Sequence, residues 1–144
     1  MTTVLWVRYL KNGNITSEQQ DLWALYHFSD HLDRLCANIG IRPLSEFHDA
    51  ADVDEEEGPA PAPHESAGTL NEYLTMASRG QWYPPEEGLD ILDKLLDTLR
   101  RSPVRFGLLK DHYIEVMVDL AECRQSIEKA RREGAKFKLC AVKS

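Results

Sequence analysis

The stretch Thr3-Val4-Leu5-Trp6-Val7-Arg8-Tyr9-Leu10 decides the fold of this chain. It is rich in β-branched and aromatic residues, the types that favour extended backbone. Val4 and Trp6 alternate with Leu5 and Val7, so both faces carry apolar side chains. This pattern predicts a strand that is buried, at least in part, on both faces. The turn pair Asn12-Gly13 follows it.

Residues 135–142 offer this strand a partner. Lys136 and Lys138 alternate there with Phe137 and Leu139, which is the pattern of a half-buried strand. An isolated two-stranded ribbon is marginal in water, so such a sheet has to lie on helices. We therefore expect the two ends of the chain to pair with each other. A short third strand near Ile15 is one open alternative, and a helix that begins at Ser17 is the other.

Four helices are predicted between the terminal strands. Apolar residues at steps of three and four predict one helix that closes at Gly40 and another over about 108–133, with Leu109 on its buried face. A short helix is expected over about 69–78, and the run Pro84-Pro85-Glu86-Glu87 predicts the start of a helix that ends near Arg101. The chain thus reads as a single α+β domain, 1–144, mostly helical, with about four helices and a small sheet.

The composition is that of an ordinary globular chain, with 144 residues, 42% apolar and 28% charged. No apolar run is long enough to cross a membrane. The net charge of −7 argues against a nucleic-acid binder that depends on a general positive field. Residues 41–66 carry eight carboxylates and one arginine, so this piece supplies the whole net charge. Its alternating prolines favour extended backbone, and we expect an acidic, Pro-rich, mobile loop at 49–66.

The N-terminus and the cysteines bear on the compartment. The first residues lack a basic region, and Arg8 interrupts the apolar stretch too early for a signal peptide. Cys36, Cys123 and Cys140 are odd in number and show no CxxC spacing. We expect reduced, buried cysteines and a bacterial-type cytosol.

The run Arg79-Gly80-Gln81-Trp82-Tyr83 is the first candidate for binding. Arg79, Trp82 and Tyr83 are of types enriched at binding hot spots. Packing is the alternative, because either ring can close the core between helices. His48, with Glu46 and Asp49 beside it, is a further candidate as a general base. No serine or cysteine nucleophile pattern accompanies it, so no catalytic residue is assigned.

His27 and His31 are four residues apart, the spacing that places two imidazoles on one helix face for a metal. They lie off the apolar stripe and no third ligand is fixed by spacing, so we interpret them as exposed surface, with a metal as the weaker alternative. The sequence has no Walker A, GxGxxG or HExxH motif, no pair of zinc-binding CxxC motifs and no RNP-type aromatic motif. We expect no cofactor.

Three segments resemble small uncharacterised bacterial proteins. Residues 32–47 are similar to an L-x-x-L-x-x-x-L-G-[VI]-x-P-L-x-x-F pattern, residues 82–89 to W-[FY]-x-P-x-x-G-L, and residues 128–142 to a final helix and strand. The resemblance implies a compact bacterial domain with a structurally specified Trp82 loop, and it implies no activity.

These observations favour a non-catalytic protein-binding module, such as an immunity-type inhibitor or adaptor. Its partner would be a protein, and a basic one if the acidic loop takes part; nucleic acid and membrane are not expected. The alternative is a small-ligand binder or enzyme with its site near the Trp82–Tyr83 loop.

Overall fold

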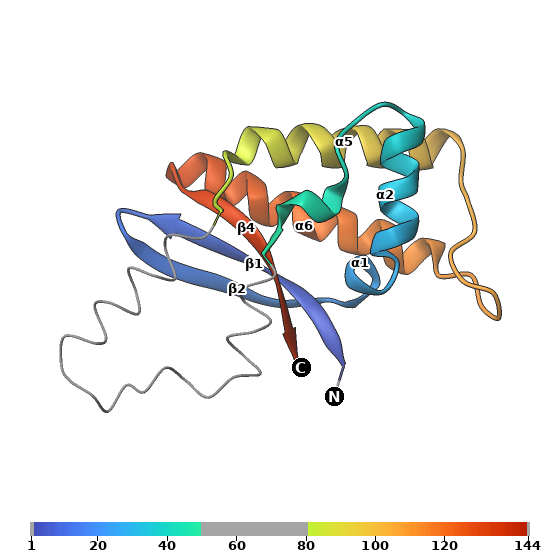
Figure 1. Cartoon of the computed structure of the whole chain (residues 1–144), viewed down its shortest axis with the longest axis horizontal. Helices are drawn as coiled ribbons and strands as arrows, with labels where there is room; N and C mark the ends of the chain where they lie inside the picture. The colour runs from blue at the N-terminus through green and yellow to red at the C-terminus, as the bar shows by residue number, and fades with distance from the viewer. Residues whose placement is uncertain (1, 50–80, 144) are drawn as a thin grey trace.

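The first and last strands of the chain lie side by side. In the computed structural model, which describes residues 2–49 and 81–143, β1 (Thr3–Lys11) pairs antiparallel with β4 (Lys136–Lys143). β2 (Asn14–Leu22) pairs antiparallel with the other side of β1, and the two-residue β3 (His48–Asp49) pairs in parallel with β4. The sheet order is therefore β2-β1-β4-β3, and Figure 1 shows the two termini next to each other. The predicted sheet of terminal strands is confirmed.

Four α-helices complete the described part of the chain. They are α1 (Trp23–His27), α2 (Ser29–Asn38), α5 (Pro85–Arg101) and α6 (Tyr113–Glu133), with a 3-10 helix, η1, at Leu44–Phe47. As predicted, α5 begins at a proline followed by two glutamates, which suit the positive end of the helix dipole. α6 ends at Gly134, whose φ of 70° is a left-handed cap. Helices and sheet together confirm the α+β class.

One face of the sheet forms the floor of the core. Leu5 and Val7 of β1 and Phe137 and Leu139 of β4 are buried there. α6 lies over this face and α5 packs against α6 (Figure 1). The other face carries a second, smaller cluster of Val4, Cys140 and Val142, with Trp6 and Trp23 partly buried against it. Both faces of β1 are thus partly covered, as its sequence predicts.

Residues 14–28 do not follow the alternative in which a helix begins at Ser17. β2 continues to Leu22, which lies opposite Leu5 of β1, and no helix begins at Ser17. Pairing with β1 satisfies the backbone of this segment, a long-range effect that outweighs the local capping signal. The helical stretch that follows is also divided, because Phe28 separates α1 from α2.

The last helix begins later than predicted. α6 starts at Tyr113, and Leu109 is fully exposed rather than on a buried helix face. The Asp111 carboxylate accepts hydrogen bonds from the backbone N–H groups of Phe106 and Tyr113, both at 3.0 Å. These bonds fold residues 106–112 into a loop that ends where the helix begins.

Three predicted features lie outside the described residues: the short helix over 69–78, the acidic segment beyond Asp49, and Arg79. Among the helices that the structure describes, none combines the length and the apolar character needed to span a membrane.

Candidate functional site

Trp82 and Tyr83 lie at the edge of β4. Tyr83 and Phe137 exchange two backbone hydrogen bonds, of 2.9 and 3.0 Å, which form an isolated antiparallel bridge. Trp82 is buried, and the Lys138 ammonium lies 4.4 Å from the centre of its ring. Tyr83 is half-buried. Packing therefore accounts for the buried Trp82 ring, while the Tyr83 ring remains partly accessible to solvent.

Tyr83 also joins η1 to the start of α5. Its hydroxyl donates to the backbone oxygen of Glu46, and its ring contacts Phe47 edge-on at 4.9 Å. The guanidinium of Arg42 lies 5.6 Å from the Tyr83 ring and forms ion pairs with Glu46 at 2.9 Å and with Glu87 at 2.5 Å. This side of Tyr83 is thus fixed by contacts that hold the fold together.

His48 reaches the same edge of β4. It lies opposite Leu139, two positions from the Phe137 that pairs with Tyr83, so about 7 Å separates these positions along the strand. Burial lowers the pKa of His48, and the nearby Asp33 carboxylate opposes part of that shift. The structure therefore places His48, Trp82 and Tyr83 along one edge of β4. His48 Nε2 and Trp82 Nε1 are buried, and neither has a hydrogen-bond partner within the described ranges.

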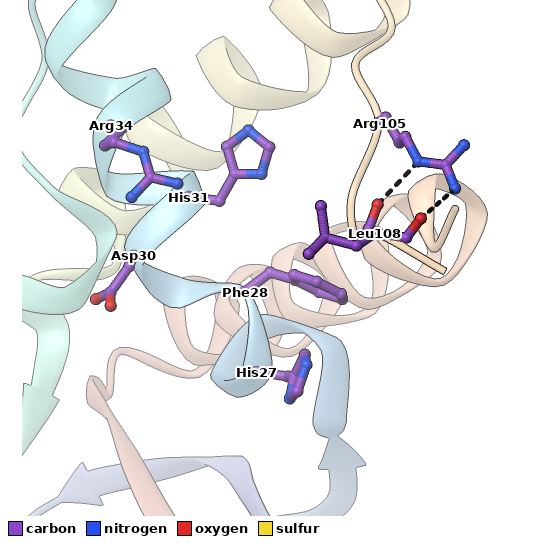
Figure 2. Close-up of a pocket in the computed structure, with 8 residues that line it drawn as sticks. His27, Phe28, Asp30, His31, Arg34, Arg105 and Leu108 are labelled. Carbon is purple, nitrogen blue, oxygen red and sulfur yellow. Dashed lines mark hydrogen bonds between the residues drawn. The ribbon is translucent and has the colours of Figure 1, made fainter. Parts of the chain in front are cut away.

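A second region, which the sequence did not reveal, is a cleft between the α1–α2 junction and the loop of residues 104–112. Two adjoining hollows of about 540 and 460 Å³ share His27, Phe28, Gly107 and Leu108 as walls. Figure 2 shows the Phe28 ring beside the Leu108 side chain, with His31 and Arg34 on α2 and Arg105 on the far side of Leu108. We call this region the histidine cleft. The residues that line it are His27, Phe28, Asp30, His31, Arg34, Arg105, Gly107, Leu108, Leu109, Lys110 and His112.

Aromatic and imidazole rings that contact one another edge-on or at a tilt form the floor of the histidine cleft. Phe28 is central: its ring lies 4.6 Å from that of His27 and 5.6 Å from those of Phe106 and His112. His31 packs on Phe106 at 4.5 Å. Burial, and then the charge of Arg34, lowers the pKa of His31. The ring contacts make this floor largely an aromatic surface.

The wall of the cleft formed by residues 104–112 is held by hydrogen bonds. Arg105 donates from Nε to the carbonyl of Gly107 at 2.8 Å and from Nη2 to that of Leu108 at 2.9 Å. Gly107 has a φ of 104°, and a Cβ atom there would lie 2.5 Å from the Lys110 carbonyl oxygen. Only glycine fits this backbone without strain.

This loop presents leucines to solvent. Leu108 is 96% exposed and Leu109 fully so, and Ile114 and Val118 on the first turns of α6 are 70% and 47% exposed. We call these four side chains the 108–118 apolar surface. Leu108 and Leu109 are neighbours in the chain, and contiguous exposed apolar residues are typical of interaction sites.

His27 and His31 do not share one regular helix. Phe28 lies between α1 and α2, and the two imidazoles contact different rings. His27 is exposed, as predicted, but His31 is half-buried. Over residues 2–49 and 81–143, no group of three or more His, Cys, Asp or Glu side chains is arranged to hold a metal ion.

Comparisons with models of protein families, with curated proteins and with solved structures found no match to this chain. The function is therefore argued from the chain's own geometry, and the resemblance to small bacterial proteins stays a prediction.

Proposed function

We propose that this protein is a non-catalytic protein-binding module, of the immunity-inhibitor or adaptor kind, that docks through the 108–118 apolar surface. The observation that carries this proposal is the almost complete exposure of Leu108 and Leu109. Burying one leucine side chain in a partner contributes about 1.5–3 kcal/mol. Leucines at the tip of a loop gain nothing comparable from folding, whereas a docked partner would supply that gain.

The loop suits this role because its conformation is held before binding. Arg105 and Asp111 each make two hydrogen bonds to the loop backbone, and Gly107 supplies its left-handed residue. A surface that is already ordered loses less conformational entropy when it binds.

The proposed setting is a bacterial cytosol. The three cysteines are free and buried, which suits a reducing compartment. A basic partner would be favoured by the acidic segment 49–66, and that part of the proposal rests on the charge of the sequence alone.

The test compares partner capture by three forms of the tagged full-length chain: wild type, a Leu108→Asp/Leu109→Asp variant and an Ile39→Asp control. Ile39 is also an exposed apolar residue, but it caps the far end of α2. We expect a partner that the wild type and the control retain and that the double variant loses. When the purified partner is mixed with each purified form, the wild type and the control should bind it more tightly than the double variant. If every recovered protein binds the double variant as well as wild type, this docking surface is wrong.

A small-ligand or catalytic site near Trp82–Tyr83 is the second candidate function. One observation favours it, namely that His48, Trp82 and Tyr83 share one edge of β4, with two buried ring nitrogens that lack hydrogen-bond partners in the described ranges. A binding activity lost in His48→Asn but kept in the Leu108→Asp/Leu109→Asp variant would favour this site over the 108–118 apolar surface.

A further inference from the structure

The histidine cleft carries positive charge on two arginines. Arg34 and Arg105 line it, and within residues 2–49 and 81–143 neither forms an ion pair. Of the other arginines in the same ranges, Arg42, Arg101, Arg124 and Arg131 form such pairs, whereas Arg100 and Arg132 form none there. A negative group that enters the cleft would therefore meet two arginines that form no ion pair within residues 2–49 and 81–143.

Arg105, the arginine on the 104–112 loop, is also held in place by hydrogen bonds. Its two hydrogen bonds to the carbonyls of Gly107 and Leu108 use two of the five N–H donors of a guanidinium. The other three have no acceptor among the described residues. A guanidinium held this way loses little side-chain entropy when a carboxylate binds, which favours the pairing.

The other charges around the cleft do not cancel this preference. Asp30 is the one carboxylate among the lining residues, against the two arginines. Lys110 and His112 line the smaller of the two hollows, and both contact Glu115, which lies outside the lining. The lining therefore favours an anion.

Apolar surface lies directly beside these charges. Phe28 and Leu108 face each other across the cleft in Figure 2, and Arg105 flanks Leu108. A ligand that fits both features carries an acidic group next to a large apolar one. Since Leu108 also belongs to the 108–118 apolar surface, a single partner segment can contact both.

We propose that the histidine cleft binds an acidic side chain, Asp or Glu, of the partner protein, while a neighbouring large apolar side chain of the same segment packs between Phe28 and Leu108. This inference rests on the proposed protein-binding function, and it specifies the chemistry of the partner. The acidic segment 49–66 would meet a different, basic part of that partner.

The test uses two capped peptides that differ in one group, acetyl-Gly-Glu-Leu-Gly-amide and acetyl-Gly-Gln-Leu-Gly-amide, titrated into the ¹⁵N-labelled full chain. We expect the Glu peptide to shift the amide signals of residues 27–34 and 105–112 and to bind about threefold to tenfold tighter than the Gln peptide, as one solvent-accessible charged hydrogen bond allows. Arg34→Gln should remove most of that preference. The matched control, Arg100→Gln, changes an exposed arginine of α5 that makes no ion pair with the described residues, and it should leave the preference unchanged.

Three results would overturn the inference: equal binding of the two peptides, a Glu preference that survives Arg34→Gln, or shifts confined to other residues. A fourth result would also overturn it, namely that N-acetylleucinate binds as tightly as the Glu peptide. This small acid carries the same apolar group, so equal binding would mean that the cleft is a site for small acids. If the charge preference fails while partner capture still depends on Leu108 and Leu109, the inference falls and the proposed function stands.

Discussion

The carboxylate of Asp119 on α6 accepts a hydrogen bond of 2.8 Å from the backbone N–H of Ala24, in the first turn of α1. A second, longer bond comes from the N–H of Leu25 at 3.4 Å. The first N–H groups of a helix have no carbonyl partner within it, and α1 has no side-chain cap of its own. Asp119 therefore caps α1 from another helix, and it fixes the wall of the histidine cleft that carries His27.

We predict that Asp119 makes the stability of the protein fall as pH rises. Burial, aided by the nearby carboxylates of Glu122 and Glu115, raises the pKa of Asp119 from its ordinary 3.8 to about 6. The folded state then holds this proton more tightly than the unfolded state, so the stabilisation is present below about pH 4 and is lost as the pH passes about 6. One pKa unit corresponds to about 1.4 kcal/mol, and partial exposure to water reduces the effect.

Asp119→Asn isolates this group, because the amide oxygen still accepts the hydrogen bond and the other titrating groups are common to both proteins. The free energy of unfolding, taken as wild type minus variant, should fall by about 1 kcal/mol between pH 4 and pH 7 in denaturant titrations. A difference that does not change with pH would contradict the raised pKa.

Gly88 on α5 should not tolerate alanine. A Cβ atom at this position would lie 2.5 Å from Cζ of Phe137 and 3.2 Å from Cδ1 of Ile127. In an open helix the change from glycine to alanine gains about 1 kcal/mol, whereas overpacking a core costs about 1–3 kcal/mol. We therefore expect Gly88→Ala to lower the free energy of unfolding by up to about 2 kcal/mol, and Phe137→Leu to recover part of the loss in the double variant. A stabilised Gly88→Ala protein would show that α5 moves away from the sheet easily.

The parts of the fold that could be predicted are those set by local patterns. The alternation in β1 and β4, the Pro85 start of α5 and the Gly134 end of α6 are all visible in neighbouring residues. The extent of β2 could not be predicted, because it depends on pairing with β1 across a turn. That pairing competes with a plausible helix cap in the same residues. The start of α6 was misplaced for a similar reason, since Asp111 bonds to Phe106 as well as to Tyr113.

The same distinction between local patterns and long-range packing applies to the candidate sites. The sequence singled out His48 and Trp82–Tyr83, and the sheet brings them to one edge although more than thirty residues separate them. The histidine cleft was missed because its walls, near Phe28 and near Leu108, lie about eighty residues apart in the chain. No local spacing relates Arg34 to Arg105, and only the packing of α2 beside the loop reveals their shared cleft.

Gly107→Ala should open the loop that carries the exposed leucines. The φ of 104° disfavours any side chain, and the new Cβ would meet the Lys110 carbonyl oxygen. We expect faster hydrogen exchange at the amide of His112, which donates to the Phe106 carbonyl at 2.7 Å in the intact loop. Gly134→Ala is the matched control, because Gly134 also has a positive φ, of 70°, but has open space around it. It should cost about 1 kcal/mol in stability without changing exchange in the loop. Equal exchange at His112 in all three proteins would contradict the assigned role of Gly107.

Leu109→Ser tests whether the 108–118 apolar surface contributes to folding at all. The Leu109 side chain is fully exposed, so its removal leaves no cavity and changes little buried area, and the free energy of unfolding should move by less than about 0.5 kcal/mol. Leu96→Ala is the comparison, because Leu96 on α5 is 3% exposed and its truncation should cost about 2–5 kcal/mol. Chemical denaturation of both variants measures the two values directly. A neutral Leu109→Ser that also lowers partner affinity separates binding from stability, which is what a docking residue requires. A loss above about 1 kcal/mol would instead mean that Leu109 packs within its own chain, and the docking surface would have to be sought elsewhere.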